Sequence, residues 1–182
     1  AEEQVREFLK ESNVNSRGEL EWRGRILTCD FIRSEVEAEF KRKGFSASGT
    51  IVACGADSAI PHCIGSGPVR VGEPVVADIF PRSDRTGFWG DMTRTFVKGK
   101  ASKRLREMFD SVKKASELAL EHLKPGVPGA LIHQLAAKSM EEDGFQTGHD
   151  AQGRPCGFIH GLGHGVGLEI HEEPRLSPAN PN

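Results

Sequence analysis

The order of predicted secondary-structure elements occurs twice along the chain, and this repeat constrains the fold more than any other feature. In the first half, residues 1–98, a helical pattern over residues 1–13 precedes a second helix that Thr28 caps and Gly44 stops. Three segments with the apolar, β-branched composition of strands follow, at Thr50–Ala53, Pro74–Phe80 and Phe88–Val97.

The second half, residues 101–182, begins the same order again. A long helix opens at Ser102, and its apolar face carries Leu105, Met108, Phe109, Val112, Ala115, Ala119 and Leu123. A further helix from about residue 130 to 143 ends at Gly144. Two helix–helix–strand units predict one α+β domain over residues 1–182, with helices on the outer side of a curved antiparallel sheet.

The second unit is shorter after its helices than the first, which predicts that its final hairpin is missing. Residues 175–182 offer no candidate for the functional side chains that such a hairpin would carry by analogy with the first unit. We therefore expect either a C-terminally truncated piece of the domain or a divergent member of its kind.

A glycine- and histidine-rich run at residues 160–174 has the composition of a functional site rather than of a core element. It reads His-Gly-Leu-Gly-His-Gly-Val-Gly-Leu-Glu-Ile-His-Glu-Glu-Pro and holds His160, His164 and His171. Glycine lets a backbone approach an ion or a substrate closely, and neutral imidazole is the commonest nitrogen ligand of transition metals.

Two aspartates upstream supply oxygen donors for such a site. Asp78 lies in the apolar run Val75–Phe80, and Asp91 lies in residues 90–96, Gly-Asp-Met-Thr-Arg-Thr-Phe. Two carboxylates with one or two imidazoles form the mixed ligand set of a hydrolytic metal centre. Asp84 is a rival to Asp78, but its Ser-Asp-Arg setting is typical of an exposed turn.

Residues 90–96 and 161–174 together resemble the metallopeptidase family that includes methionine aminopeptidase, Xaa-Pro aminopeptidase and prolidase. The resemblance runs from about residue 30 to residue 177 and implies the pita-bread fold of that family. The Gly-Asp-x-Thr-Arg-Thr pattern is more similar to the prolidase and Xaa-Pro aminopeptidase branch. The segment between Asp78 and Asp91 is slightly longer than the family pattern.

The resemblance also implies a role for each candidate residue. It gives Asp78, Asp91 and His164 as metal ligands, His171 and His62 as catalytic histidines, and His160 as a histidine of the substrate pocket. The family supplies two further glutamate ligands on the final hairpin, which this chain lacks. The remaining histidines, His122, His133 and His149, match nothing in the family and are expected at the surface.

The activity implied by the resemblance is that of a metal-dependent aminopeptidase or dipeptidase. Such an enzyme hydrolyses an N-terminal Xaa-Pro bond with a hydroxide activated by two divalent ions of manganese, cobalt, zinc or iron. Without the glutamates, we expect the 182-residue chain to be inactive alone, with its site empty or weakly occupied. Two alternatives stay open: a metal-free pita-bread protein-interaction module and a creatinase-like C–N hydrolase.

Composition argues against several other classes of protein. The formal net charge of −2 gives no general attraction to nucleic acid or to an anionic membrane. No apolar stretch approaches the roughly 20 residues of a membrane span. The four cysteines, Cys29, Cys54, Cys63 and Cys156, form no Cys-x-x-Cys pair, which argues against a zinc knuckle or a disulfide scaffold and for a reducing, cytoplasmic setting. We expect a peptide substrate and keep a homodimer as an open alternative.

Overall fold

A computed structural model gives the fold of the chain, and the structure describes residues 1–179. The chain divides into two compact units. The first comprises residues 1–102 with 166–170, and the second comprises residues 103–165 with the segment from residue 171 onward. Residues 180–182 of the tail considered above lie outside the described residues.

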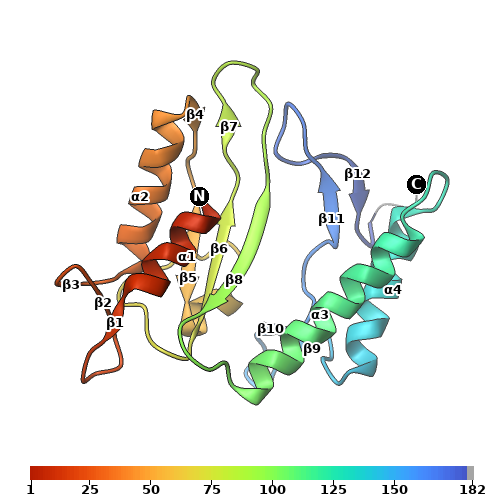
Figure 1. Cartoon of the computed structure of the whole chain (residues 1–182). Helices are drawn as coiled ribbons and strands as arrows, with labels where there is room; N and C mark the ends of the chain where they lie inside the picture. The colour runs from red at the N-terminus through yellow and green to blue at the C-terminus, as the bar shows by residue number, and fades with distance from the viewer. Residues whose placement is uncertain (180–182) are drawn as a thin grey trace. The chain divides into compact units, whose positions relative to one another are not determined.

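Two helices of the first unit begin and end close to where the sequence predicts (Figure 1). They are α1 (Glu2–Glu11) and α2 (Cys29–Arg42). The side chain of Thr28 accepts a hydrogen bond from the backbone N–H of Phe31, which satisfies one of the unpaired donors at the start of α2. Gly44, with a φ of 79°, adopts the left-handed conformation just after the helix ends.

A three-stranded antiparallel sheet forms the centre of the first unit. It consists of β5 (Ile51–Cys54), β6 (Pro74–Ile79) and β8 (Met92–Val97), in the order β5-β6-β8. Burial alternates along β6, with Val75, Ala77 and Ile79 buried. These three side chains pack in one core with apolar residues of α1 and α2, so the helices cover one face of the sheet.

A long hairpin joins β6 to β8. Ile79 lies opposite Met92, and beyond the regular strands Arg82 still bridges Trp89, so one register continues along both arms. Near the tip of the hairpin, β7 (Arg82–Ser83) pairs with β4 (Phe45–Ser46). The segment Val166–Ile170 also belongs to this unit, where Gly167 O accepts a hydrogen bond from the Trp89 N–H.

The connection between α1 and α2 contains a small sheet that the sequence does not indicate. Its strands are β1 (Asn13–Val14), β2 (Leu20–Trp22) and β3 (Arg25–Ile26). Phe8 contacts the rings of Trp22 and Phe31 at centroid distances of 5.0 and 5.5 Å, and these contacts tie α1 and the small sheet to α2. The short 3-10 helix η1 (Gly55–Ala59) follows β5 directly.

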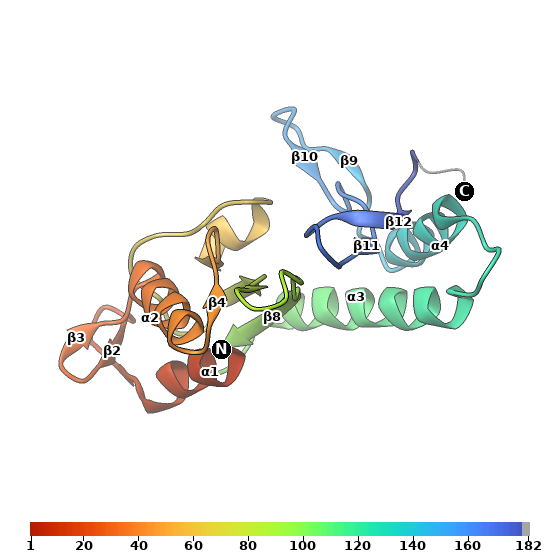
Figure 2. The same cartoon turned by 90° about the horizontal axis from the view of Figure 1, so that it is seen from above.

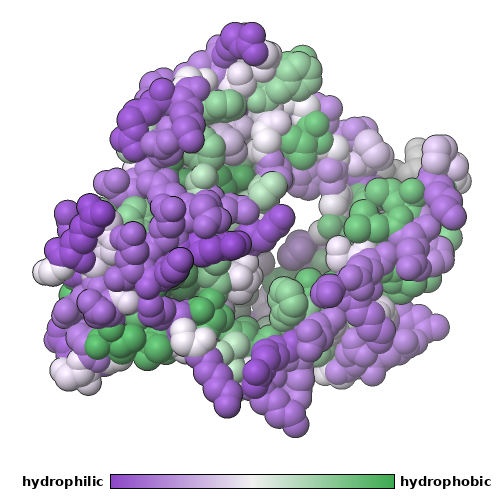
Figure 3. Space-filling model, in the orientation of Figure 1, coloured by the Kyte–Doolittle hydropathy of each residue, from purple (hydrophilic) through white to green (hydrophobic). Residues whose placement is uncertain are grey.

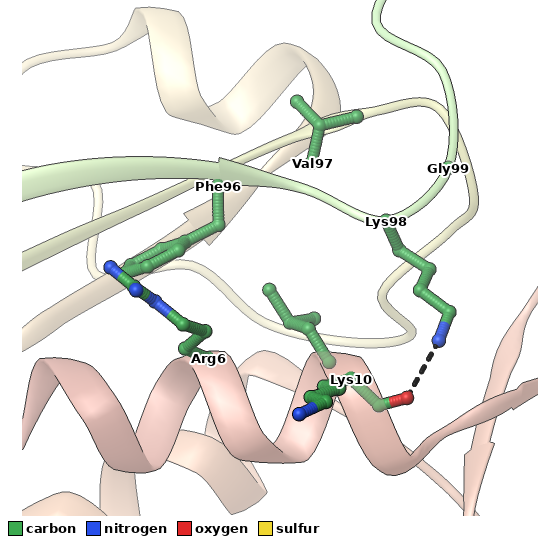
Figure 4. Close-up of a pocket in the computed structure, with 7 residues that line it drawn as sticks. Arg6, Lys10, Phe96, Val97, Lys98 and Gly99 are labelled. Carbon is green, nitrogen blue, oxygen red and sulfur yellow. Dashed lines mark hydrogen bonds between the residues drawn. The ribbon is translucent and has the colours of Figure 1, made fainter.

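The helix α1 also contacts the end of β8, around an open cavity of about 240 Å³ (Figure 4). In this view the side chain of Arg6 points towards the ring of Phe96. Lys98, just after β8, donates a hydrogen bond from Nζ to the backbone oxygen of Lys10 at 3.0 Å. The last strand of the sheet is therefore fastened to the first helix.

In the second unit, α3 (Lys103–His122) packs against α4 (Gly129–Glu142) (Figure 2). The buried side of α3 is a stripe of the small residues Ser111, Ala115 and Ala119. The larger members of its predicted apolar face, Met108, Phe109, Val112 and Leu123, are between 44% and 62% exposed. The difference arises because α4 packs along the small-residue stripe, and hydrophobic residues consequently reach the surface of the molecule (Figure 3).

Two short antiparallel pairs complete the second unit. The strand β9 (Gly148–His149) pairs with β10 (Pro155–Cys156), and β11 (Gly163–Gly165) pairs with β12 (Glu172–Leu176). Helices combined with antiparallel sheets confirm the α+β prediction. Among residues 1–179, no helix has both the length and the apolar character needed to cross a bilayer.

Candidate active site

Asp78 lies near the end of β6, on the face of the sheet opposite the helices. Its neighbours Ala77 and Ile79 are buried on the helix side, so the alternation of strand side chains turns Asp78 the other way. Thr93 lies directly opposite on β8 and donates a hydrogen bond from Oγ1 to Asp78 Oδ1 at 2.5 Å. This contact orients the carboxylate, as the outer partners of metal ligands do.

Asp91 comes just before β8 and follows the same register. Because Ile79 faces Met92 and Arg82 faces Trp89, Asp91 falls opposite Phe80. Diagonal neighbours in such a pair lie on one face, about 7–8 Å apart. The hairpin therefore presents Asp78 and the exposed Asp91 on the same face of the sheet.

Asp84, the rival to Asp78, has a structural environment at the hairpin tip. Its carboxylate accepts hydrogen bonds from Ser46 Oγ at 2.6 Å and from Lys41 Nζ at 3.3 Å. The hydrogen bond from Ser46, followed by the charge and hydrogen bond of Lys41, holds the pKa of Asp84 below its usual value. Asp84 thus fastens the hairpin to α2 and β4, and Asp78 stays the stronger candidate ligand of the two.

His62 lies in an exposed loop that follows η1 and has a positive φ of 62°. The loop is fixed by Arg33 of α2, whose Nη1 donates to Ile64 O at 2.7 Å and to Gly65 O at 3.0 Å. A Cβ atom at Gly65 would lie 2.0 Å from Val52 O, so the loop packs on β5 more closely than any side chain would allow. The histidine thus projects from a constrained segment.

His164 is the central residue of β11, and its ring contacts the backbone of the next residue. Its Nδ1 lies 3.0 Å from the carbonyl oxygen of Gly165, a contact that requires a proton on Nδ1. In the neutral ring the lone pair is then on Nε2, the nitrogen through which this histidine could bind a metal. The ring centroid of His171 lies 4.4 Å away at an interplanar angle of 74°.

The glycine-rich sequence brings these two histidines together. The register of β11 against β12 shifts between His164 and Gly165. A Cβ atom at Gly165 would lie 2.4 Å from the backbone oxygen of Glu173, so only glycine lets the two strands approach at this point. The pairing holds His171 beside His164.

His160 lies in a short aromatic stack that also contains Phe158 and His133. For His133 the prediction of a surface position is wrong. The ring of His160 contacts the edge of Phe158 at 5.1 Å, and Phe158 stacks on His133 at 4.8 Å. His133 is expected at the surface but is 7% exposed, because Phe158 covers it on α4. Burial, together with the nearby charge of His160, lowers the pKa of His133, which favours the neutral ring. His122 and His149 are exposed as predicted.

The candidate ligands belong to different units: Asp78 and Asp91 to the first, His164 to the second. Among the side chains of residues 1–179, no group of three or more His, Cys, Asp or Glu is arranged to hold a metal ion. The chemistry of the donors nevertheless fits a divalent ion, since it combines two carboxylates with an imidazole.

Two residues that support the site were missed by the sequence analysis. Thr93 could have been found by counting the register of the hairpin, which sets it opposite Asp78. Arg33 carries no such signal, because its contacts to Ile64 and Gly65 depend on how α2 packs against a distant loop.

Comparison with known proteins relates the chain to one group of peptidases. The sequence model of metallopeptidase family M24 matches residues 5–182. The Xaa-Pro dipeptidase of Pyrococcus furiosus is 36% identical over 149 residues, which cover 80% of this chain and 40% of that protein. The chain therefore spans about two fifths of the length of this relative.

Solved structures give the same relationship. The prolidase from Pyrococcus furiosus matches 99% of this chain with a TM-score of 0.77 and 31% identity, and this match covers 48% of the prolidase chain. The X-Pro aminopeptidase from Thermotoga maritima matches 100% of this chain with a TM-score of 0.77 and 28% identity, over 46% of its own length.

Proposed function

The chain belongs to metallopeptidase family M24 and has its pita-bread fold, and from this premise we propose that the complete protein hydrolyses the bond between an N-terminal residue and a following proline. The 36% identity to an Xaa-Pro dipeptidase carries the proposal. The placement of Asp78 and Asp91 on one face of the sheet supports it, since hydrolysis in this family depends on metals.

We assign the metal ligands to Asp78, Asp91 and His164. Their donor atoms suit a divalent ion, and Thr93 holds the carboxylate of Asp78 in one orientation. The contact of His164 Nδ1 with Gly165 O supports the assignment because, in the neutral ring, it leaves Nε2 as the nitrogen that can bind a metal. Bound divalent ions supply Lewis-acid activation of water and of the scissile carbonyl.

The other histidines act on the substrate in this proposal. His171 donates a hydrogen bond to the carbonyl oxygen as negative charge develops there, and the ring of His164 supports it from one side. His62 transfers a proton at the amine of the leaving group, from a loop that Arg33 holds in place. His160 lines the substrate pocket, and Phe158 contacts its ring.

The test is Asp91→Asn in the complete protein, compared with Asp84→Asn. The amide keeps the shape of the side chain and removes the charge, so Asp91→Asn should abolish metal-dependent hydrolysis of Xaa-Pro peptides while unfolding stays cooperative. Asp84→Asn should leave turnover near that of the unmodified protein, because Asp84 contacts only Ser46, Lys41 and Gly44 in the hydrogen bonds described here. Full turnover by Asp91→Asn would remove the assignment.

The substrates used in this assay separate the remaining alternatives. Cleavage of the dipeptide Xaa-Pro alone would indicate a dipeptidase, and cleavage of longer Xaa-Pro peptides would indicate an aminopeptidase. Preference for an N-terminal methionine before alanine would place the protein in the methionine aminopeptidase branch. Hydrolysis that persists after chelation would favour a creatinase-like C–N hydrolase, and absence of both metal and hydrolysis would favour an interaction module.

A further inference from the structure

Two cysteines from different elements of the first unit have their thiols in contact. Cys29 is the first residue of α2, and Cys54 is the last residue of β5. Both are free, and the Cys29 thiol donates a hydrogen bond to Cys54 with the Sγ atoms 3.0 Å apart. A disulfide bond is about 2.05 Å long, so the two sulfurs need to approach by only about 1 Å to bond.

The two thiols differ in accessibility and in acidity. Cys29 is fully buried, whereas Cys54 is partly exposed. The hydrogen bond from Cys29 lowers the pKa of the Cys54 thiol, and the same bond, together with burial, raises the pKa of Cys29. The thiolate is the reactive form of cysteine. Cys54 is therefore suited to react first, with a reagent that arrives from solvent, and the buried Cys29 is suited to react second, with Cys54.

We propose that Cys29 and Cys54 are a redox-active pair that closes to an intramolecular disulfide on exposure to a disulfide oxidant such as oxidised glutathione. The Cys54 thiolate attacks one sulfur of the oxidant, which forms a mixed disulfide and releases one glutathione thiolate. Cys29 then gives up its proton to solvent and attacks the Cys54 sulfur, which breaks the mixed disulfide and releases the second glutathione. Two protein thiols are oxidised while one oxidised glutathione is reduced to two thiols.

The disulfide would lie at the base of the loop that carries His62. Cys54 immediately precedes η1, and α2, which begins at Cys29, already holds the far end of this loop through Arg33. Closing the bond between α2 and β5 would therefore restrain both ends of the segment from Gly55 to Gly67. At the Gly67 end, Asp30 of α2 already accepts a hydrogen bond from the Gly67 N–H at 3.0 Å. Local opening of this segment should become rarer in the oxidised state. In a reducing compartment such a bond is reversible.

The experiment uses the full 182-residue chain in buffers of reduced and oxidised glutathione. After equilibration, the native protein is quenched by acid, denatured and alkylated, and its intact mass and cysteine-containing peptides are measured. Under oxidising conditions the chain should lose two of its four alkylatable thiols, and one cross-linked peptide should join Cys29 to Cys54. Cys63→Ser and Cys156→Ser are matched controls that should give the same cross-link.

Single substitutions test the order of the two steps. Cys29→Ser should stop at a glutathione adduct on Cys54, whereas Cys54→Ser should leave Cys29 reduced. The proposal would be overturned if the unmodified chain kept four reduced thiols under oxidising conditions. It would also be overturned by a cross-link from Cys54 to Cys63 or Cys156. Both results are measured on the unmodified chain, so neither depends on the folding of a variant. Amide exchange across residues 55–67 should slow several-fold on oxidation, and equal exchange in both states would overturn the coupling to the loop.

Discussion

The hydroxyl of Thr93 donates a hydrogen bond to the carboxylate of Asp78 across the β8–β6 pair, with Oγ1 and Oδ1 2.5 Å apart. Thr93 follows Asp91 by two residues, so the strand that brings one candidate ligand also orients the other. The two aspartates are thus positioned by a single hairpin, whatever the rest of the protein contributes.

Replacing Thr93 by valine should weaken metal binding without unfolding the sheet. Valine keeps the branched shape that suits a strand and removes only the hydroxyl that orients Asp78. Loss of such an outer partner costs about 10- to 100-fold in metal affinity, which calorimetric titration of the complete protein would measure. Thr93→Ser keeps the donor and should bind close to normally. Equal affinity for the valine variant and the unmodified protein would show that Thr93 does not position a ligand.

Alanine at Gly165 should destabilise the β11–β12 pair, whereas alanine at Gly163 should not. The added Cβ would lie 2.4 Å from Glu173 O at Gly165 but 3.6 Å from the Leu176 side chain at Gly163, which is an ordinary contact. Overpacking costs roughly 1–3 kcal/mol, so urea denaturation of the 182-residue chain should separate the two variants clearly. Identical midpoints would mean that β11 and β12 do not pair this closely.

Asp84 should make the chain more stable near neutral pH than in acid. Its folded pKa is lowered by Ser46 and then by Lys41, while an unfolded aspartate titrates near pH ~3.9. The stabilisation is therefore present above that pH and is lost as the pH falls through the folded pKa. Asp84→Asn should reduce the urea midpoint at pH 7 and leave it nearly unchanged in strong acid. Ser46→Ala should also lower the urea midpoint at pH 7, because it removes the hydrogen bond to Asp84. If Asp84→Asn lowered the urea midpoint equally at pH 7 and in strong acid, the prediction would be wrong.

The 182-residue chain alone should hold at most one weakly bound ion and should not hydrolyse Xaa-Pro peptides. It offers three ligand candidates, Asp78, Asp91 and His164, where the family pattern implies five. With fewer negatively charged ligands than the family pattern, the chain balances the charge of two divalent ions poorly. Its affinity for metal ions should therefore fall steeply. Elemental analysis after dialysis provides the measurement. Two tightly bound ions per chain, or robust hydrolysis, would show that the ligand set is complete in another way.

The sequence predicts the features that depend on local chemistry. Thr28 and Gly44 bound α2 because a cap and a left-handed glycine act within one helical turn. The strands β5 and β6 follow from apolar runs and β8 from its β-branched and aromatic residues. The family of the chain follows from two motifs that the comparisons support. The roles of the candidate site residues stay predictions, which the substitutions above address.

Features that depend on packing between distant segments could not be read from the sequence. The Cys29–Cys54 contact joins residues from a helix and a strand, and Asp84 accepts a hydrogen bond from Ser46 of the distant strand β4. Periodicity identifies the apolar face of α3 but not which part of it a neighbour covers, so Phe109 and Val112 are exposed while Ala115 is buried. His133 is buried for the same kind of reason, since Phe158 reaches it from beyond α4.

The unbroken register of the β6–β8 hairpin limits where its arms can change length. Residues inserted beyond Arg82 and Trp89 only lengthen the turn, because Ile79 still meets Met92 and Arg82 still meets Trp89 below it. One residue inserted in a single arm, between Asp91 and Met92, would turn Asp91 away from the face of Asp78 or force a bulge, whereas two would return it to that face. The turn should therefore accept insertions of any length, while the arm that carries Asp91 should accept them only in pairs.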